Sequence, residues 1–273
     1  MQQQSRMAGL NDFASSVAIV VSSCDKFFDA WRPFAFFFRK FWPDCPFRVY
    51  LIVNRLRVRS DSFQPVAVGG DKGWASNMQV ALEQVTTPYV LYMQEDYFLT
   101  APVDRQQLAD DFAYAFEHDA ASFCFYGRSE IERDFAHIND RFGVVPRNSD
   151  GRTRCQVTLW KRDVLTSALR PGETAWNMEA RGSERTRDLL AISYSAKGGG
   201  PMPCLMSAIS RGLWMPEALE LCRAHDFQIR PAFRPGYVAT PGGRRFRRAI
   251  GRVSFALAFA RQLMQPIDLD APN

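Results

Sequence analysis

Three polar side chains follow a short apolar run near the first third of the chain. Residues 89–93 are continuously apolar, which predicts a strand buried on both faces of a parallel sheet. Gln94, Glu95 and Asp96 come directly after this run. In open α/β sheets, ligands bind beyond the carboxyl ends of the strands, and carboxylates there suit a divalent cation that bridges phosphate oxygens. The alternative is a strand that simply ends in polar residues.

The elements that must position these acids alternate between strands and helices over the first hundred residues, which predicts a parallel α/β sheet. The predicted strands are residues 17–21, 47–53, 65–68, 89–93, 120–126, 155–160, 189–195 and 205–210. The predicted helices are residues 27–41, 74–85, 103–118, 161–169 and 216–224, and one more begins near Glu173. The charged residues 127–154 are predicted to form a long loop or a small hairpin.

Composition limits the function classes. The chain has 273 residues, of which 47% are hydrophobic, as in ordinary globular proteins. It carries 29 Arg, 5 Lys and a net charge of +5. Its six Cys form no Cys-x-x-Cys pair and it has only three His, so a structural zinc site is not expected. Scattered Cys, no secretory leader and no long apolar run favour a cytoplasmic protein without a membrane span.

Several motifs recur in an order that resembles the GT-A fold of nucleotide-sugar glycosyltransferases. Within that fold, the chain is similar to bacterial enzymes that build surface polysaccharide such as lipopolysaccharide or capsule. The resemblance covers residues 17–227. The motifs that carry it are Ser22-Ser-Cys-Asp25, Gly73-Trp74 with Asn77, Gln94-Glu-Asp-Tyr97, Leu159-Trp-Lys161, Trp176-Asn-Met-Glu179 with Gly182-Ser183, and Arg211-Gly-Leu-Trp214 with Glu217.

The resemblance implies a fold class and a domain organisation. The fold is a GT-A-like, Rossmann-like α/β fold, with a mixed, mostly parallel sheet flanked by helices. The catalytic domain spans residues 14–229. It follows a disordered N-terminus, residues 1–13, and precedes a Pro- and Arg-rich extension, residues 230–273.

The resemblance also implies a donor site for a nucleotide sugar. Ser22, Ser23 and Asp25 would hold the nucleotide, Asn77 would face the base or ribose, and Asp71 would lie beside them in a glycine-rich turn. The residues by themselves leave alternatives open. Asp25 equally suits a cap for the helix that follows it, and Asp71 can simply support its turn.

The acidic turn corresponds to the family's Asp-x-Asp metal site, but the final Asp is replaced by Tyr97. Asp96 would therefore be the main ligand of Mn²⁺ or Mg²⁺, with Glu95 as a second ligand. This departure from the family pattern leaves metal dependence open.

On the acceptor side, the resemblance implies that Trp176 contacts the acceptor and that Glu179 is the general base. Glu179 could instead be a surface acid that pairs with Arg185, and Trp176 could be a core residue. Asp134 and Asp140, in the long loop, are rival bases.

The implied reaction moves a sugar from a nucleotide-diphosphate donor to a glycan or a lipid-linked glycan. One base and one stabiliser of the leaving group suffice for single displacement with inversion, although the sequence leaves retention open. A nucleotidyltransferase is an alternative, but residues 22–26 lack the Gly-rich, basic loop expected there. A non-catalytic nucleic-acid-binding protein is another. No recognition motif accompanies the basic tail, so no nucleic-acid partner is expected.

The last forty residues hold a basic, amphipathic segment. Residues 244–264 contain six Arg and no acid, interleaved with apolar residues at helical spacing. This pattern is typical of a helix that lies on an anionic membrane surface. The alternative is a helix that docks on the catalytic domain with its Arg face in water.

Overall fold

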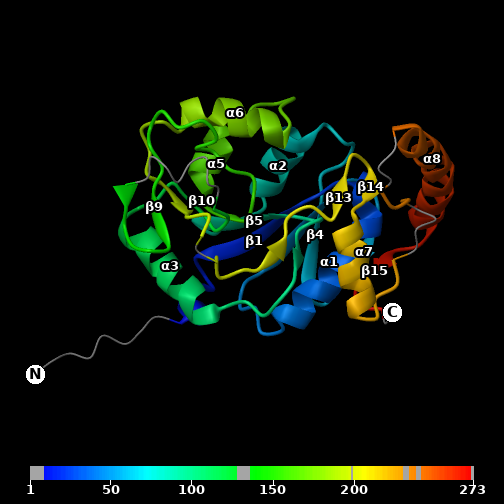
Figure 1. Cartoon of the computed structure of the whole chain (residues 1–273), viewed down its shortest axis with the longest axis horizontal. Helices are drawn as coiled ribbons and strands as arrows, with labels where there is room; N and C mark the ends of the chain where they lie inside the picture. Colours follow the sequence, from blue (N-terminus) through cyan, green and yellow to red (C-terminus); the bar gives the residue numbers. More distant parts are fainter. Residues whose placement is uncertain (1–8, 128–135, 198, 230–233, 238–240, 272–273) are drawn as a thin grey trace, which may run out of the picture.

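A mixed sheet of nine strands runs through the molecule (Figure 1). The computed structural model describes residues 9–127, 136–197, 199–229, 234–237 and 241–271. The strand order of the sheet is β4-β2-β1-β5-β10-β7-β11-β9-β8. Its strands are β1 (Val17–Ser22), β2 (Val49–Val53), β4 (Phe63–Ala67), β5 (Tyr89–Gln94), β7 (Ser122–Cys124), β8 (Ala136–His137), β9 (Phe142–Val144), β10 (Thr158–Lys161) and β11 (Ala191–Tyr194).

The parallel part of the sheet comprises β4, β2, β1 and β5. Strand β10 lies antiparallel between β5 and β7, β7 and β11 are parallel, and β9 pairs antiparallel with both β11 and β8. Every residue of β1 and β2 is buried, as expected for parallel strands covered on both faces. The predicted mixed, mostly parallel α/β class is therefore confirmed.

Helices cover both faces of this sheet, as Figure 1 shows. Alternate residues of β1 point to opposite sides: Ile19 and Val21 join one hydrophobic cluster, and Ala18 and Val20 join the other. On the first side lie α1 (Phe28–Phe41), α3 (Arg105–Glu117) and α7 (Pro216–Ala224). On the second lie α2 (Trp74–Leu82), α5 (Arg162–Ala168) and α6 (Ala175–Arg185).

One predicted strand differs from the sequence-based expectation. The predicted strand at 205–210 is two short strands, β12 (Cys204–Leu205) and β13 (Ile209–Ser210), which pair with β6 (Phe98–Leu99) and β14 (Leu213–Trp214) respectively. The chain is redirected between them, where the Ala208 N–H donates to the Asp96 carbonyl at 2.9 Å. The described part of 127–154 contains the β8–β9 hairpin, which is one of the two forms that the sequence predicted.

The N-terminus also departs from its predicted disorder over the part that the structure describes. Leu10–Phe13 forms the short 3₁₀ helix η1, in which Leu10 and Phe13 are buried. Phe13 packs edge-on against Phe112 and Phe116 of α3, with ring centroids 5.7 and 5.3 Å apart. Burial of these two apolar side chains accounts for the order of η1.

The C-terminal segment folds onto the rest of the protein. Helix α8 (Pro241–Met264) is followed by β15 (Ile267–Asp268), which pairs in parallel with β3 (Val58–Arg59). Phe255 of α8 packs on Phe28 with ring centroids 5.1 Å apart. Among the described helices, none is long and apolar enough to cross a lipid bilayer.

Candidate active site

The strand order places a binding crevice at the carboxyl ends of β1 and β5. From β1 the chain proceeds to β2 and β4 on one side, whereas β5 lies on the other, so the order reverses between β1 and β5. Ligands bind at such switch points in open α/β sheets. Ser22 at the end of β1 pairs in register with Gln94 at the end of β5. The two polar segments that the sequence singled out are therefore neighbours.

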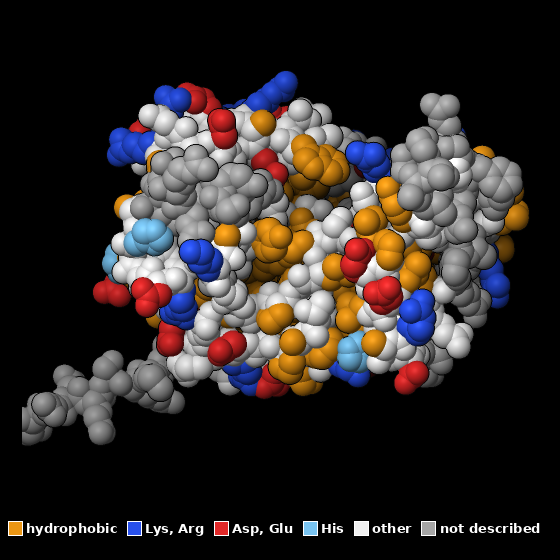
Figure 2. Space-filling model, in the orientation of Figure 1, with side chains coloured by type: hydrophobic (Ala, Val, Ile, Leu, Met, Phe, Trp, Pro, Cys, Tyr) orange, Lys and Arg blue, Asp and Glu red, His pale blue; other side chains and the backbone are white. Residues whose placement is uncertain are grey.

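Figure 2 shows a hollow on the face of the molecule between α6 and the β13–β14 hairpin, with apolar side chains inside it. Charged side chains lie around its rim.

The acidic turn after β5 holds two carboxyls in a setting that disfavours their charge. Glu95 is buried, and burial followed by the adjacent charge of Asp96 raises its pKa well above the usual range. Burial likewise raises the pKa of Asp96 to about 7, although the Ile209 N–H opposes the shift by bonding to the carboxyl. The positive charge of Arg234 acts in the same opposing direction on both groups.

A divalent cation fits this electrostatic setting because it would relieve the repulsion between two buried carboxylates. Among the described residues, no group of three or more His, Cys, Asp and Glu is placed to hold a metal. Asp96, with or without Glu95, would therefore supply only part of a coordination shell. Mg²⁺ and Mn²⁺ commonly complete such a shell with water and substrate phosphate oxygens.

The backbone of Cys155 connects the acidic turn to Glu179. The Cys155 carbonyl accepts hydrogen bonds from the Tyr97 hydroxyl at 2.9 Å and from Gln94 Nε2 at 3.1 Å. The Cys155 N–H donates to Glu179 Oε1 at 2.9 Å. The structure thus brings the proposed metal ligands and the proposed base to the two sides of one peptide segment.

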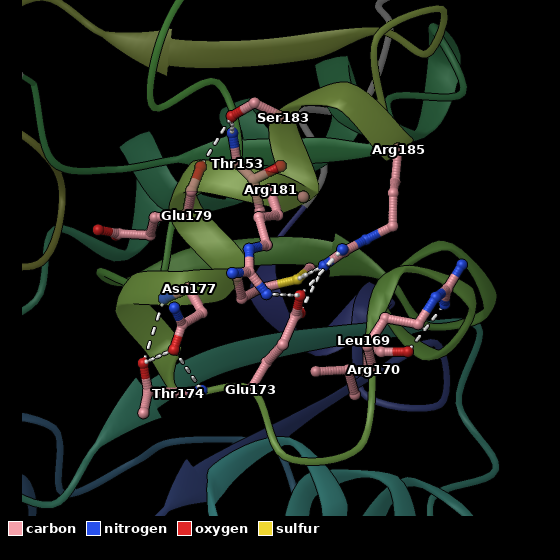
Figure 3. Close-up of polar contacts among 12 residues, drawn as sticks. Thr153, Leu169, Arg170, Glu173, Thr174, Asn177, Glu179, Arg181, Ser183 and Arg185 are labelled. Carbon is pink, nitrogen blue, oxygen red and sulfur yellow. Dashed lines mark hydrogen bonds and ion pairs between the residues drawn. The ribbon is translucent and has the colours of Figure 1, made fainter.

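Helix α6 is anchored on the sequence that precedes it, and this anchoring sets the position of Glu179 (Figure 3). Its N-terminus has a capping box in which the Thr174 hydroxyl accepts from Asn177 N and Asn177 Oδ1 accepts from Thr174 N, both at 3.2 Å. The buried Glu173 carboxylate pairs with both terminal nitrogens of Arg185, at 3.1 and 2.6 Å. Figure 3 shows the Glu179 carboxylate directed away from this pair.

The C-terminal half of α6 approaches residues 153–155 closely. A Cβ added at Gly182 would lie only 3.0 Å from a methyl carbon of Thr153, so glycine permits this approach. The Ser183 hydroxyl accepts from Thr153 N at 3.1 Å. One turn before Glu179, the Trp176 side chain is 80% exposed and hence is not the core residue considered as its alternative.

The predicted donor-side residues form a second polar network. Asp71 accepts from Lys26 Nζ at 2.8 Å, from Gly73 N at 3.0 Å and from Asn77 Nδ2 at 3.0 Å. The hydrogen bond from Lys26 is the main reason why the pKa of Asp71 is lowered. Asn77 Oδ1 accepts from Lys72 N at 3.1 Å. The turn before α2 is thereby tied to the segment that follows β1.

Asp25 is committed to the backbone of the segment after β2. Its carboxylate accepts from the N–H groups of Asn54, Arg55 and Leu56 at 2.8, 2.8 and 3.0 Å. Asp25 begins the 3₁₀ helix η2 (Asp25–Phe27), whose N-cap is Cys24, so Asp25 is not the side-chain cap considered in the sequence analysis.

The two serines are also engaged internally. The Ser22 side chain hydrogen-bonds to the buried Tyr92 phenol, and the Ser23 hydroxyl accepts from Trp31 Nε1 at 2.7 Å. These contacts fix the exit of β1. The role of the serines in donor binding stays a prediction.

Of the two rival bases, only Asp140 lies in the part of the chain that the structure describes. Asp140 lies exposed in the turn between β8 and β9, and Asp134 lies outside the described residues.

Sequence reasoning missed Arg234. Its guanidinium pairs with both carboxylate oxygens of Asp29 at 2.8 Å and donates to the Lys26 carbonyl at 2.8 Å. The side chain also lies over the Phe27 ring, 5.0 Å from its centroid. Nothing in the local sequence distinguishes Arg234 from other arginines of the tail, because its partners lie about 200 residues earlier in the chain.

No family model matches this chain, and neither does any curated protein. Among solved structures, a mannosyltransferase, PcManGT from Pyrobaculum calidifontis in complex with GDP-Man and Mn²⁺, aligns at 14% identity with a TM-score of 0.48, over 95% of this chain and 79% of that chain. TarS from S. aureus, residues 1–349, aligns at 11% identity with a TM-score of 0.44, over 66% and 60%. A UDP-glucose pyrophosphorylase complexed with UDP-glucose aligns at 9% identity with a TM-score of 0.44, over 67% and 91%.

These alignments identify neither an activity nor a substrate, since all three TM-scores are below 0.5. In the full TarS structure, the aligned part spans only 36% of that chain.

Proposed function

We propose that this protein is a nucleotide-sugar glycosyltransferase that moves a sugar from a nucleotide-diphosphate donor to a glycan or lipid-linked glycan. The observation that carries the proposal is the link through Cys155. Its carbonyl holds the acidic turn at the switch point, and its N–H holds Glu179. The acidic turn, as the carboxylate site for the leaving diphosphate, and Glu179, as the candidate base, are thus tied to the same residue. In keeping with the motif resemblance, the acceptor belongs to bacterial surface-polysaccharide synthesis.

In the proposed reaction, an acceptor hydroxyl attacks the anomeric carbon as the bond from that carbon to the diphosphate oxygen breaks. Glu179 accepts the hydroxyl proton, and the nucleoside diphosphate leaves, so the configuration at the anomeric carbon is inverted. Oε1 of Glu179 already accepts from Cys155 N, which orients the carboxylate. Asp96 would hold a divalent cation that neutralises the leaving diphosphate. Trp176, one turn earlier on α6, offers an exposed ring on which an acceptor sugar can stack.

The product of turnover tests this proposal. The full chain is incubated with Mn²⁺, a panel of nucleotide sugars and soluble glycan acceptors, and released nucleoside diphosphate is measured together with glycosylated acceptor. We expect both products in equal amounts for one donor. A nucleotidyltransferase would instead release inorganic pyrophosphate when given a nucleoside triphosphate and a sugar phosphate. Pyrophosphate release with no sugar transfer would therefore refute the proposal.

We also propose that the outer face of α8 lies on an anionic membrane, where a lipid-linked acceptor would be available. Val253, Leu257 and Met264 are 65%, 71% and 72% exposed. At 3.6 residues per turn they share one side of the helix, opposite the Phe255 side that packs on the protein. Arg252 and Arg261 are exposed and flank this apolar stripe. An apolar stripe bordered by arginines is the arrangement that binds anionic bilayers.

A further inference from the structure

A hollow of about 530 Å³ lies between η2, the turn that joins β13 to β14, and α8. Its volume is within the range of small-ligand sites. Among the described residues, four cationic ones line it: Lys26 of η2, Arg211 of the turn, Arg252 of α8, and Arg234 of the short segment 234–237. Pro235 and Phe255 supply apolar walls, and none of the described residues that line the hollow is acidic.

Only two of the four positive charges are neutralised by neighbours. Lys26 pairs with Asp71 at 2.8 Å, and Arg234 pairs with Asp29 at 2.8 Å. Neither Arg211 nor Arg252 forms an ion pair with any residue in the part of the chain that the structure describes. The hollow therefore presents two uncompensated guanidinium groups, which recognise phosphate through a planar, bidentate fork.

The backbone holds Arg211 at this position against its conformational preference. Arg211 and Gly212 form the two-residue turn between β13 and β14, with φ values of +52° and +77°. Turns of this kind favour Asn or Gly at the first position, because Gly lacks a Cβ and the short polar side chain of Asn can hydrogen-bond locally, whereas other residues are strained at positive φ. An arginine here is strained relative to those residues. Its side chain nevertheless lines the hollow.

The hollow adjoins the candidate active site through three of the segments that line it. The hairpin that carries Arg211 also bonds to the acidic turn, since Ala208 N donates to the Asp96 carbonyl at 2.9 Å. Lys26 contacts Asp71 of the donor-side network. The positive charge of Arg234 opposes the rise in the pKa values of Glu95 and Asp96.

We infer that this hollow binds a diphosphate group, with the guanidinium groups of Arg211 and Arg252 as its principal contacts. Two ligands of the proposed reaction carry this group: the nucleoside diphosphate of the donor, and the diphosphate of a lipid-linked acceptor. The choice between them rests on the proposed function. Binding of the diphosphate group itself follows from the charges and the shape of the hollow.

Inorganic pyrophosphate is the probe for the site. Its binding to the full chain is measured by isothermal titration calorimetry at low salt with a chelator present, so that no cation at Asp96 contributes. We expect the double variant Arg211→Gln/Arg252→Gln to bind at least tenfold more weakly than the wild type. Arg223→Gln is the matched control, because Arg223 is exposed on α7 and outside the hollow. It should bind within twofold of the wild type.

A second variant separates binding from folding. Arg211→Asn removes the charge while relieving strain at positive φ, so its melting temperature should be equal to or above that of the wild type. It should still bind pyrophosphate more weakly. Equal pyrophosphate affinity in the wild type and the double variant would overturn the inference. So would a wild type that does not bind pyrophosphate under these conditions.

Two further titrations identify the source of the diphosphate. If the double variant loses affinity for uridine or guanosine diphosphate, the hollow holds the donor; if it loses affinity only for farnesyl diphosphate, the hollow holds the acceptor. Sugar transfer is not part of either readout. A chain that binds pyrophosphate through these arginines but transfers no sugar would refute the proposed function and leave the anion site standing.

Discussion

At the residue scale, the fold places the carboxyls of Glu95 and Asp96 where their charged forms are disfavoured. Adjacent carboxyls at the end of a buried strand lose hydration, and both pKa values are raised as a result. Strongly perturbed pKa values that arise from desolvation in a crevice are typical of functional sites. Removal of the Asp96 carboxylate is therefore expected to raise stability and to lower activity.

Asp96→Asn should stabilise the protein at high pH and abolish its activity. Because the folded state holds the Asp96 proton up to a pH of about 7, ionisation of Asp96 costs folding free energy as the pH rises from about 4 to 7. At pH 8 the variant should be more stable than the wild type by on the order of 2 kcal/mol, and the difference should shrink below pH 4. Urea unfolding of both proteins across this pH range measures the difference in their free energies of unfolding.

The same variant tests the cation site. Mn²⁺ should raise the melting temperature of the wild type but not of Asp96→Asn, since a ligand stabilises only the state that binds it. Sugar transfer should fall at least about a hundredfold. Near wild-type turnover in Asp96→Asn would show that the donor site lies elsewhere.

Glu179→Gln should slow transfer without disturbing the fold. The amide oxygen of Gln can still accept from Cys155 N, so the hydrogen bond at 2.9 Å is retained while the base is lost. We expect normal nucleotide-sugar binding and turnover reduced at least about a hundredfold. Glu184→Gln, an exposed acid on the same helix, is the matched control and should be unaffected. If Glu179→Gln transfers sugar normally, Asp140→Asn becomes the next variant to test.

At the element scale, the site depends on how loops after separate strands are tied to one another. Asp25 ties the exit of β1 to residues 54–56 after β2, and Cys155 ties the exit of β5 to α6. These ties use backbone N–H and carbonyl groups that would otherwise be buried without partners. The crevice is therefore held open by hydrogen bonds between elements, which makes these ties targets for stability measurements.

Asp25→Asn should destabilise the protein. The substitution replaces an anion that accepts three backbone hydrogen bonds by an amide that can accept at fewer positions and adds an unpartnered donor. We expect a loss of about 2 to 4 kcal/mol in the free energy of unfolding. Asp188→Asn, at an exposed acid, should change it by less than about 0.5 kcal/mol. An Asp25→Asn protein of unchanged stability that fails to bind nucleotide would instead favour direct nucleotide contact.

At the scale of the whole molecule, the C-terminal segment packs against α1 and forms hydrogen bonds with it. Besides the Phe255–Phe28 contact, Arg39 pairs with Asp270 at 2.8 Å and donates to the Leu269 carbonyl at 2.7 Å. Leu269 itself is buried. One side of α8 is thus docked on the protein while the other side carries the exposed apolar stripe. The docked interpretation therefore applies to the Phe255 side of α8, and the membrane interpretation stays a proposal for the opposite side.

A chain that ends after Thr240 should be markedly less stable than the full chain. It loses the Phe255 contact, the β15–β3 pairing and the Arg39 ion pair. We expect the free energy of unfolding to fall by at least about 3 kcal/mol, as for the loss of large buried apolar side chains. Thermal unfolding of the full chain and of the shortened chain tests this expected loss of stability. An unchanged melting temperature would mean that the docked face contributes little.

The membrane proposal is tested on the full chain for that reason. Val253→Ser/Leu257→Ser/Met264→Ser changes only exposed side chains, so the fold should persist. Binding to vesicles that contain anionic lipid should weaken at least about tenfold, because each buried apolar side chain contributes about 1.5 kcal/mol or more. Leu189→Ser, at an exposed site away from α8, is the control. If the wild-type protein does not bind anionic vesicles at low salt, the membrane proposal is refuted.

The local pattern of the sequence determined the class of fold and the place of the acidic turn. Continuous apolar runs at β1, β2 and β5 predict strands buried on both faces, and the structure has them there. Because such strands end where polarity returns, the position of Glu95 and Asp96 at a strand exit could be predicted from sequence alone. The helical periodicity of residues 244–264 likewise predicted a helix there, and α8 spans Pro241–Met264.

Tertiary structure alone decided which groups meet. Cys155 gave no chemical signal in the sequence, since it acts through its peptide group, which every residue has. Arg234 finds Asp29 across 205 positions, and the β13–β14 turn brings Arg211 beside Arg252 of α8. Such contacts depend on how the elements pack around the sheet and on burial that local periodicity does not encode. The same packing raises the pKa of Asp96, so the chemistry of that carboxyl was decided by the fold.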